Sequence, residues 1–296
     1  MEAEFLRWLK TTLQLQTQTH PGIGDDCSTL VLEPHLTPVI TTDSLVDQVH
    51  FDTDHQPLEQ IGWKSLAVNL SDIAAMGATP SYAVVSLITP ATYSLAELQT
   101  LYKGILSLAM ETGTQIVGGD FNSHRGPLTI GLTVIGQASP SQLKYRFATK
   151  ETDRIFITGP LGRSIEGHHL NFTPCLAEGR ILASFPAVHS ITDVTDGLVI
   201  DLNSILPDGL GAILDADRIP CRNPSNDPHS DIQHALFDGE DFELLFTVDS
   251  EFDIKDLTAA LPRDIYEIGA VNSNNRISIK YNDNNIQQLD ITGYEH

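Results

Sequence analysis

The sequence predicts an α/β (α+β) protein that is divided into two units. Its 296 residues, 41% hydrophobic and 19% charged, have an ordinary globular composition and are numerous enough for two cores. Strand-like and helix-like segments alternate up to about residue 137, and a second series of strands and glycine turns follows. We therefore expect an N-terminal domain at residues 1–137 and a C-terminal α+β domain at residues 138–296.

In the first unit, apolar periodicity and breaking residues predict helices that alternate with short strands. The expected helices are Glu4–Leu15, the apolar stretch Ile61–Pro80, which Gly77 and Pro80 end, and Leu95–Thr112, which ends at Gly113. The expected strands are Thr29–Leu32, Leu36–Thr42, Ser81–Thr89, Gln115–Val117 and Leu128–Gly136.

The second unit shows weaker periodicity and more loops. The expected elements are the strands Arg154–Thr158, Phe242–Val248 and Ile265–Val271, the helix Leu198–Leu206 and a hairpin over Asn272–Asn285. Glycine-rich or polar loops are expected at residues 159–164, 191–197 and 224–229.

The charge of the chain excludes several kinds of partner. A net charge of -22, from 39 acids against 17 bases, disfavours nucleic acid, because that affinity rests on Lys and Arg. No apolar run approaches the roughly 20 residues that span a bilayer, so we expect no membrane contact and a cytoplasmic protein. The three cysteines, Cys27, Cys175 and Cys221, are too scattered for a disulfide framework.

Asp72 stands in the middle of the most apolar helix. An ionised carboxylate in apolar surroundings requires a positive partner, and neither Lys nor Arg lies within one helical turn of it. Ser65, Asn69 and Asp72 fall on one narrow polar stripe. Two interpretations remain open at this point: Asp72 faces solvent on an amphipathic helix, or it binds a metal ion.

Further aspartates recur at the ends of predicted strands and in turns: Asp25, Asp26, Asp43, Asp120, Asp193 and Asp196. Short carboxylate side chains that converge from turns are the hard oxygen ligands that Mg²⁺ prefers. Each could instead be an ordinary turn former, and Thr195 or Asp196 could cap the helix that follows. Several such turns lead directly out of apolar strands, which favours a shared metal site.

Other nucleotide-binding and catalytic motifs are absent. The chain contains no GxxxxGK[ST], no completed GxGxxG, no HExxH and no GxSxG. His168 and His169 are adjacent on a helix and are expected at the surface, and Cys27 has no basic neighbour that would make it a nucleophile.

Six segments together resemble the thiamine-monophosphate kinase family. They are GIGDDC at 22–27, TTDSLVDQVHF at 41–51, the helix 64–80, GGD at 118–120, TDVTDGL at 192–198 and DGEDFELLFTV at 238–248. Their order and spacing match over nearly the whole chain, from about Glu4 to residues 293–295. The similarity to aminoimidazole ribonucleotide synthetase and selenophosphate synthetase is more distant.

The resemblance implies a two-domain fold like that of aminoimidazole ribonucleotide synthetase, in a homodimer whose N-terminal sheets pair. It implies ATP as co-substrate and several Mg²⁺ ions. The implied metal ligands are Asp26, Thr41, Thr42, Asp43, Asp72, Asp120, Asp193 and Asp196, of which Asp43, Asp72 and Asp120 would be catalytic. The implied nucleotide contacts are Thr42, Tyr102, Gly119, Asp120, Arg146 and Thr195, and Ser65 and Asn69 would support the metal site.

The thiamine phosphate would meet His50, Glu240 and Ile291. Ile291 stands where the family has an aromatic residue, and Asp238 replaces a glycine of the GGED motif. The loop Phe121–Arg125 is about two residues longer than usual, which leaves the role of Arg125 open, and residues 171–179 are shortened.

These features together predict phosphoryl transfer from ATP to thiamine monophosphate, which gives thiamine diphosphate. The acceptor phosphate, with a second pKa of about 6, is already ionised at neutral pH, which explains why the sequence shows no candidate general base. The alternatives are another ATP-dependent enzyme of the same superfamily, acting on an aminoimidazole precursor or on selenide, and a non-catalytic acidic metal-binding protein.

Overall fold

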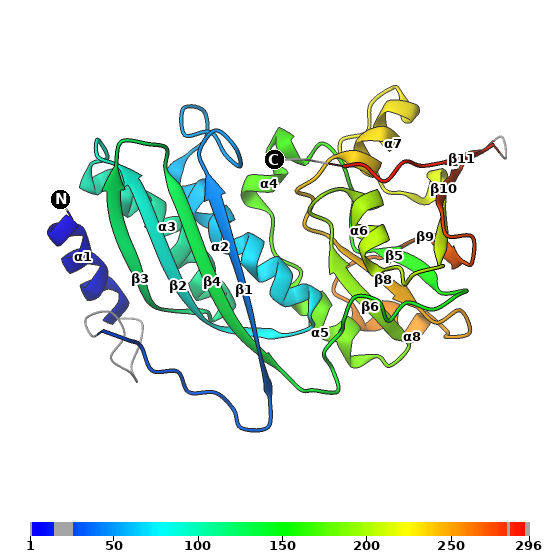
Figure 1. Ribbon diagram of the computed structural model, residues 1–296, viewed down its shortest axis with the longest axis horizontal. Helices are drawn as coiled ribbons and strands as arrows, with labels where there is room; N and C mark the ends of the chain where they lie inside the picture. The colour runs from blue at the N-terminus through cyan, green and yellow to red at the C-terminus, as the bar shows by residue number, and fades with distance from the viewer. Residues whose placement is uncertain (1, 15–25, 283–284, 294–296) are drawn as a thin grey trace.

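The computed structural model describes residues 2–14, 26–282 and 285–293, which form two units side by side along the long axis (Figure 1). Each unit is built on its own sheet. The elements of the first unit are α1 (Glu2–Gln14), β1 (Thr37–Val46), α2 (Leu58–Ala75), β2 (Thr79–Pro90), α3 (Leu95–Thr112), β3 (Gln115–His124) and β4 (Thr129–Ala138).

The four strands of the first unit lie in the order β1-β4-β2-β3. β4 pairs antiparallel with β1 and β2, whereas β2 and β3 are parallel. Ser44, Gly131, Ser86 and Asp120 are successive partners across the sheet, so they form one row from edge to edge. β1 and β3 are therefore the two edges, about 14 Å apart at three strand spacings.

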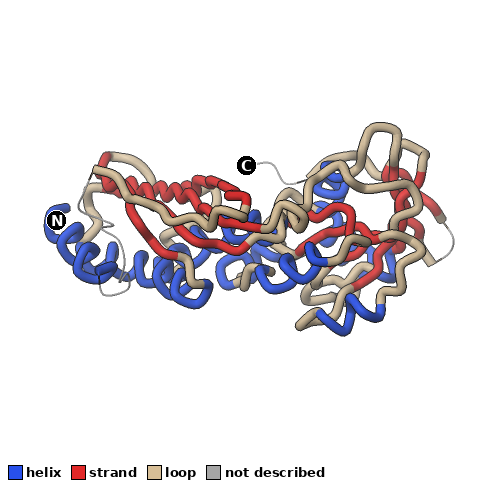
Figure 2. The backbone as a smooth tube through the Cα atoms, turned by 90° about the horizontal axis from the view of Figure 1, so that it is seen from below, coloured by secondary structure: helices blue, strands red, loops and turns tan. Residues whose placement is uncertain are grey.

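Helices cover one face of this sheet only, as the edge-on view shows (Figure 2). Alternate residues of β1 are exposed on the other face, where Ile40 is 72% exposed. Two glycines let α2 and α3 approach closely beneath the sheet: a Cβ on Gly62 would lie 1.9 Å from the Leu101 carbonyl oxygen, and one on Gly104 would lie 1.8 Å from that of Glu59. The pair is held backbone to backbone, so neither position has room for a side chain.

The second unit carries a sheet of seven strands in the order β11-β10-β7-β9-β5-β8-β6, in which only β10 and β7 are parallel. Its strands are β5 (Arg154–Ile157), β6 (Val188–Asp193), β7 (Gly211–Asp215), β8 (Leu244–Val248), β9 (Tyr266–Asn272), β10 (Ile277–Lys280) and β11 (Ile286–Gln288). Its helices are η1 (Ser164–Glu166), α4 (His168–Asn171), α5 (Leu176–Ser184), α6 (Leu198–Ile205), η2 (Ala216–Arg218), α7 (Pro228–Phe237) and α8 (Lys255–Ala260).

Helix α2 lies between the two units. It packs on β1 and β4 of the first sheet and on α4, α5 and β6 of the second unit. The approach to α5 is close, since a Cβ on Gly179 would lie 2.1 Å from the Ala74 carbonyl oxygen. The buried apolar side chains of the first unit continue without a break into one face of the second sheet, and a separate cluster fills the other face. The residues of α2 can therefore reach groups from both units.

Several expectations from the sequence are confirmed and others are wrong. The three N-terminal helices form: α3 has the expected ends, whereas the ends of α1 and α2 are shifted. Gly77 follows α2 with a left-handed φ of 67°. Thr29–Leu32 is not a strand. Asn272–Asn285 is not a simple hairpin, because β10 leaves β9 and pairs instead with β7 and β11. The expected loop 224–229 ends in the first turn of α7, and residues 191–193 belong to β6. Residues 15 and 22–25 lie outside the described residues.

Candidate active site

A cavity of about 270 Å³ opens between the two units, and six of the fifteen predicted site residues line it. The lining residues are Asp43, Ser44, Leu45, His50, Val68, Asp72, Thr195, Asp196, Glu240 and Phe242. They come from β1 and the turn that follows it, from α2 and from two loops of the second unit. The cavity thus gathers side chains that are up to about 200 positions apart in the chain. We call it the acidic cleft.

Asp43 and Asp72 face each other across the β1–α2 contact. The Thr41 hydroxyl donates a hydrogen bond to the Asp72 carboxylate. Burial, reinforced by the negative charge of Asp72, raises the pKa of Asp43 to about 6. Burial also raises the pKa of Asp72, while the Thr41 hydrogen bond and the positive charge of Arg146 act in the opposite direction. The two carboxylates therefore repel each other at neutral pH.

Asp193 adds a third carboxylate from the end of β6. It is buried, and the Ser71 hydroxyl of α2 donates a 2.6 Å hydrogen bond to its Oδ2. Burial, followed by the charge of Asp72, raises the pKa of Asp193 to about 7. Asp72 thus repels both Asp43 and Asp193. The three carboxylates come from both units and adjoin the acidic cleft, although Asp193 itself does not line it.

The predicted supporting roles of Ser65 and Asn69 are wrong. Both side chains are fully buried and turn back onto α2: the Ser65 hydroxyl donates to the Gly62 carbonyl at 2.7 Å, and the Asn69 amide donates to the Ser65 carbonyl at 3.3 Å. Ser71, one residue before Asp72, supports the carboxylates instead. The sequence carried a sign of this, since Ser71 is a polar residue in the same apolar run.

The loop that carries Thr195 and Asp196 is held by a residue that sequence analysis missed. Asp201, in the first turn of α6, accepts hydrogen bonds from the backbone N–H groups of Thr195 at 2.8 Å and Asp196 at 3.0 Å. Burial raises the pKa of Asp201 to about 7, although these two bonds oppose the shift. An acidic residue in the first turn of a predicted helix was the available signal.

Lys64 was also missed, and it joins the two predicted substrate residues. Its ammonium group is fully buried and donates to Glu240 Oε1 at 2.7 Å and to the His50 carbonyl oxygen at 2.6 Å. His50 Nδ1 accepts a hydrogen bond from the Val46 backbone N–H at 3.1 Å, so the neutral ring carries its proton on Nε2. Burial lowers the pKa of Lys64, and the adjacent Glu240 carboxylate opposes that shift. A lysine within an apolar helix was the signal in the sequence.

Glu240 has an unusual backbone. Its φ is 61° and that of Phe242 is 54°, both in the left-handed region that non-glycine residues rarely occupy. The backbone is fixed by the hydrogen bond from Glu240 N–H to the Thr195 carbonyl at 2.8 Å. Asp238, the departure from the GGED motif, has a structural use, since its carboxylate accepts the Arg163 backbone N–H at 2.9 Å.

A second group of predicted residues lies apart from the acidic cleft. Tyr102, Gly119 and Asp120 line a small cavity of about 40 Å³ next to α1, which Phe5 and Phe121 also border. Asp120 is exposed on β3, at the opposite edge of the sheet from Asp43 on β1. One chain therefore does not bring Asp120 together with Asp43 and Asp72.

Thr42 projects from the same open face of the sheet as Asp120. Alternation along β1 turns Thr41 and Asp43 toward α2 and turns Thr42 the other way, where it is exposed. Its hydroxyl donates to the Leu132 carbonyl at 2.9 Å and accepts from Thr133 at 3.0 Å. The Thr42 hydroxyl is thus separate from the three carboxylates of the cleft.

The remaining predicted residues lie around these two places. Asp26 is exposed, as are Arg146 and Ile291, and Ile291 does not line the acidic cleft. The terminal segment nevertheless passes the cleft, since a Cβ on Gly293 would lie 2.1 Å from the Asp196 carbonyl oxygen.

The surface assignment of His168 and His169 is wrong. His169 is 2% exposed, and its Nδ1 lies 2.9 Å from the Ser164 carbonyl oxygen. His168 is half-buried beside the Asp241 carbonyl oxygen. The α4 helix packs on α2, which the local sequence does not reveal.

The oxygen ligands present suit a hard divalent cation. The charge of Asp72 repels Asp43 and Asp193, and a bound cation would neutralise this repulsion. Among the described residues, however, no three Asp, Glu, His or Cys side chains stand close enough together to chelate one ion. Further oxygens, such as those of bound phosphates, would have to complete the coordination.

Comparison with known proteins first gives the class. Residues 24–138 match the family model of the N-terminal domain of AIR synthase related protein, and residues 136–282 match that of its C-terminal domain. The chain is therefore a two-domain protein of the AIR synthase related class. Across the described ranges, no helix is both long and apolar enough to cross a membrane.

Relatives of known name narrow this class. The chain is 37% identical to the thiamine-monophosphate kinase of Rhodopirellula baltica over 85% of its own length and 83% of the relative. The crystal structure of thiamine-monophosphate kinase from Stenotrophomonas maltophilia has a TM-score of 0.80 at 29% identity, covering 93% of this chain and 95% of that one. AaThiL complexed with AMPPCP and TMP has a TM-score of 0.71 at 25% identity, covering 98% and 95%. The chain belongs to the thiamine-monophosphate kinase family.

Proposed function

We propose that this protein transfers the γ-phosphoryl group of ATP to thiamine monophosphate, giving thiamine diphosphate and ADP. The observation that carries the proposal is the acidic cleft, in which Asp43 and Asp72, with the buried Asp193 adjoining Asp72, lie beside the His50–Lys64–Glu240 group. Membership of the kinase family, and the AMPPCP and TMP bound by AaThiL, support this reaction. We propose the cytoplasm as its location, which the three free cysteines support.

The reaction requires little proton transfer by the protein. The acceptor is a phosphate monoester with a second pKa of about 6, so its attacking oxygen is already ionised at neutral pH. Positioning and charge neutralisation remain as the tasks of the site. His50 Nε2–H would donate a hydrogen bond to the thiamine monophosphate. The Glu240 carboxylate, which Lys64 fixes, would accept a hydrogen bond from the same substrate or attract the substrate's positively charged ring.

Asp43, Asp72 and Asp193 would hold magnesium ions, and Asp26, Thr41 and Asp196 are candidates for further contacts. Bound Mg²⁺ would supply the positive charge that lets two phosphate groups approach each other. Arg146 is the cation that already acts on Asp72. The protein's own part is to hold these carboxylates at fixed positions, which it does with Thr41 and Ser71.

We further propose that the working unit is a homodimer in which one chain completes the site of the other. Thr42 and Asp120 lie on the open side of the sheet, and Asp120, Gly119 and the buried Tyr102 border the small cavity at its far edge, too distant to join Asp43 and Asp72 within one chain. Pairing of two sheets through this uncovered face would bring the nucleotide residues of one protomer to the carboxylates of its partner.

Mixed dimers test this sharing. Asp72→Asn and Asp120→Asn should each abolish turnover without unfolding. If the site is shared between chains, unfolding and refolding the two inactive variants together should recover activity, because about a quarter of the sites would combine two intact halves. Each variant refolded alone is the control. One variant is labelled with ¹⁵N, so that mixed dimers can be recognised by their mass. No recovery, with mixed dimers demonstrated in this way, would contradict sharing between chains.

A substrate panel tests the reaction itself. We expect ADP release to require thiamine monophosphate and Mg²⁺ together, with no release above background for thiamine, selenide or an aminoimidazole precursor. Release with selenide or the precursor would favour the other enzymes of the superfamily. No release with any acceptor, at saturating Mg²⁺ and ATP, would favour a non-catalytic metal-binding protein.

A further inference from the structure

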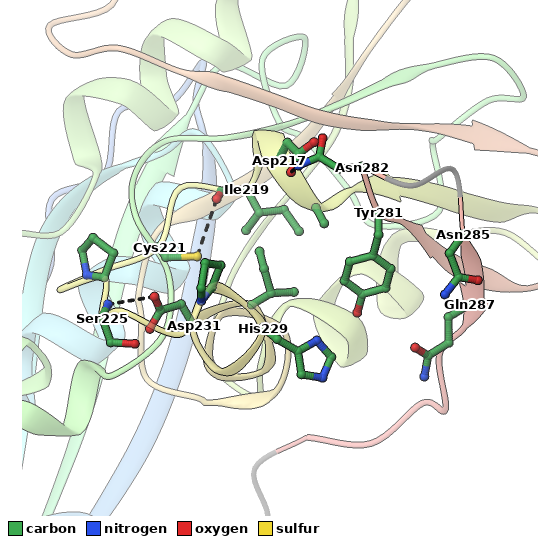
Figure 3. A pocket seen from close by; sticks show the side chains of 14 residues that line it. Asp217, Ile219, Cys221, Ser225, His229, Asp231, Tyr281, Asn282, Asn285 and Gln287 are labelled. Atoms are coloured by element: carbon green, nitrogen blue, oxygen red, sulfur yellow. Dashed lines mark hydrogen bonds between the residues drawn. The ribbon is translucent and has the colours of Figure 1, made fainter.

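A second sizeable cavity lies away from the acidic cleft. It has a volume of about 620 Å³ and opens in the C-terminal unit between α7, the end of β7 and the β10–β11 pair (Figure 3). Its lining residues are Ala216, Asp217, Ile219, Cys221, Pro224, Ser225, Pro228, His229, Asp231, Ile232, Tyr281, Asn282, Asn285 and Gln287. None of them lines the acidic cleft. We call this space the α7 pocket.

The α7 pocket has an apolar floor and an amide-bearing rim. Ala216, Ile219 and Ile232 are buried at its base. Asn282 and Gln287 are exposed at the rim, and Asn282 is oriented by a 2.6 Å hydrogen bond to Asp217. A volume of several hundred cubic ångströms with apolar walls and a few convergent polar groups is typical of small-molecule sites.

Tyr281 provides an unused polar group. Its hydroxyl oxygen is buried and has no hydrogen-bond partner among the described residues. In Figure 3 it points toward the side of the pocket that His229 and Gln287 flank. The Tyr281 and His229 rings lie 6.1 Å apart, tilted by 43°, so they form an aromatic wall. An unpaired buried hydroxyl is energetically unfavourable, and a ligand with a matching acceptor or donor would satisfy it.

The charges around the pocket select against anions. None of the described lining residues is Lys or Arg, whereas Asp217 and Asp231 are both present. Asp231 is already engaged, since it accepts from Arg163 at 2.8 Å and from the Ser225 backbone N–H at 2.8 Å. A phosphate or carboxylate ligand would find no cation here to offset the cost of removing it from water.

We propose that the α7 pocket binds a nitrogen heteroaromatic molecule of nucleoside size that carries no negative charge. The apolar floor and the aromatic wall would accept the faces of its ring. The Tyr281 hydroxyl and the rim amides would pair with the ring nitrogens and amino groups at its edge, because both can donate and accept hydrogen bonds. This site is independent of the acidic cleft and of the reaction proposed for it.

Cys221 provides a readout inside the pocket. It is half-buried there, and burial raises the pKa of its thiol, so it should react slowly with iodoacetamide. Cys27 is exposed and serves as a reference for the reagent, whereas Cys175 is buried and reacts only if the protein unfolds. Peptide mass spectrometry measures the three alkylation rates separately in one sample of the full chain.

The probes are adenosine, which is neutral, thiamine, which is cationic, and AMP, which carries the adenosine ring with a negative charge. We expect adenosine or thiamine to slow alkylation of Cys221 by about tenfold at ten times its Kd, and to leave Cys27 unchanged. AMP should protect at least about tenfold less well than adenosine. The proposal would be overturned if neither adenosine nor thiamine protected Cys221 up to its solubility limit while Cys175 stayed unreactive. Equal protection by AMP and adenosine would overturn the charge selection.

A one-atom change assigns the effect to the pocket. Tyr281→Phe should leave the alkylation rate of free protein unchanged and raise the half-protecting concentration about three- to tenfold, as expected for one lost hydrogen bond. Tyr266→Phe, on β9 outside the pocket, is the matched control and should behave like the parent. Protection that is identical in Tyr281→Phe and the parent would overturn the assigned role of the hydroxyl.

Discussion

Lys64 and Glu240 form an ion pair across the boundary between the two units, with Nζ and Oε1 2.7 Å apart. The lysine is 0% exposed and the glutamate side chain only 15%. Because the same ammonium also binds the His50 carbonyl, one buried charge fixes both predicted contacts to the thiamine phosphate. The pair therefore connects domain packing to the shape of the substrate site.

Replacing Lys64 by Met keeps the length of the side chain and removes its charge. Loss of one partner of a buried ion pair costs about 3–5 kcal/mol, so we expect the free energy of unfolding to fall by roughly that amount. The KM for thiamine monophosphate should rise at least about tenfold, while the KM for ATP changes less than about twofold. Urea unfolding and steady-state kinetics measure these effects.

Two further variants make that result specific. Lys64→Met combined with Glu240→Gln should recover part of the stability, because the unpaired carboxylate is removed. The Lys255 side chain is 86% exposed in its ion pair with Asp253, so Lys255→Met should change the free energy of unfolding by less than about 0.5 kcal/mol. An equal rise in both KM values for Lys64→Met would show that the pair does not act at the thiamine phosphate.

Ser71 and Ser65 of α2 offer a matched comparison. Ser71 donates to Asp193, whereas Ser65 donates to its own helix backbone. Ser71→Ala should raise the Mg²⁺ concentration that gives half-maximal turnover, and should lower turnover about tenfold or more. The reason is that a hydrogen bond to a charged group contributes about 1.5–3 kcal/mol. Ser65→Ala should leave the Mg²⁺ dependence unchanged. Measuring ADP release over a Mg²⁺ titration separates the two, and similar curves would contradict the role of Ser71.

Asp201 predicts a specific dependence of stability on pH. Burial raises its pKa in the folded state to about 7, from a usual value of 3.8. The folded protein therefore binds more protons than the unfolded chain between these values, so this group's contribution is present at low pH and is lost as the pH rises through about 7.

The variant Asp201→Asn removes the titration and keeps an oxygen acceptor for Thr195 and Asp196. Relative to the parent, it should gain about 1–3 kcal/mol in the free energy of unfolding as the pH rises from 4 to 8, since one pKa unit corresponds to about 1.4 kcal/mol. Asp253→Asn, at an exposed site, should show no such trend. If the free energy of unfolding of Asp201→Asn, relative to the parent, fell as the pH rises, the raised pKa of Asp201 would be contradicted.

Gly104 tests the contact that positions α2. An added Cβ would lie 1.8 Å from the Glu59 carbonyl oxygen, so α3 would have to move away from α2. Gly104→Ala should lower the free energy of unfolding by about 1–3 kcal/mol despite its better helix propensity. Denaturant unfolding measures this change. A stabilised variant would show that the two helices do not touch there.

The sequence predicts well what depends on local pattern. The helix around Asp72 and the strand expected at Leu36–Thr42 follow from apolar periodicity and β-forming residues. Both form, although the strand runs past Asp43 to Val46. The pattern of aspartates in turns favoured a shared site, but only the resemblance named Asp43, Asp72 and Asp193 as its ligands, and Asp193 belongs to the other unit. Pattern alone left open whether Asp72 faced solvent.

Other features depend on contacts that no local pattern encodes. Lys64 and Glu240 are separated by 176 positions, so their pairing cannot be predicted from either segment. The strand order places β3 and β1 at opposite edges, which divides Asp120 from Asp43 even though both follow apolar strands. Ser65 and Asn69 share a stripe with Asp72, but helix packing leaves them buried against their own backbone.

The most direct test of the central claim is ³¹P NMR of the parent protein incubated with ATP, thiamine monophosphate and Mg²⁺. We predict that the monophosphate resonance of the acceptor is replaced by the two coupled resonances of thiamine diphosphate, with one ADP formed for each product molecule. Formation of ADP together with inorganic phosphate, while the thiamine monophosphate resonance persists, would contradict phosphoryl transfer to thiamine monophosphate.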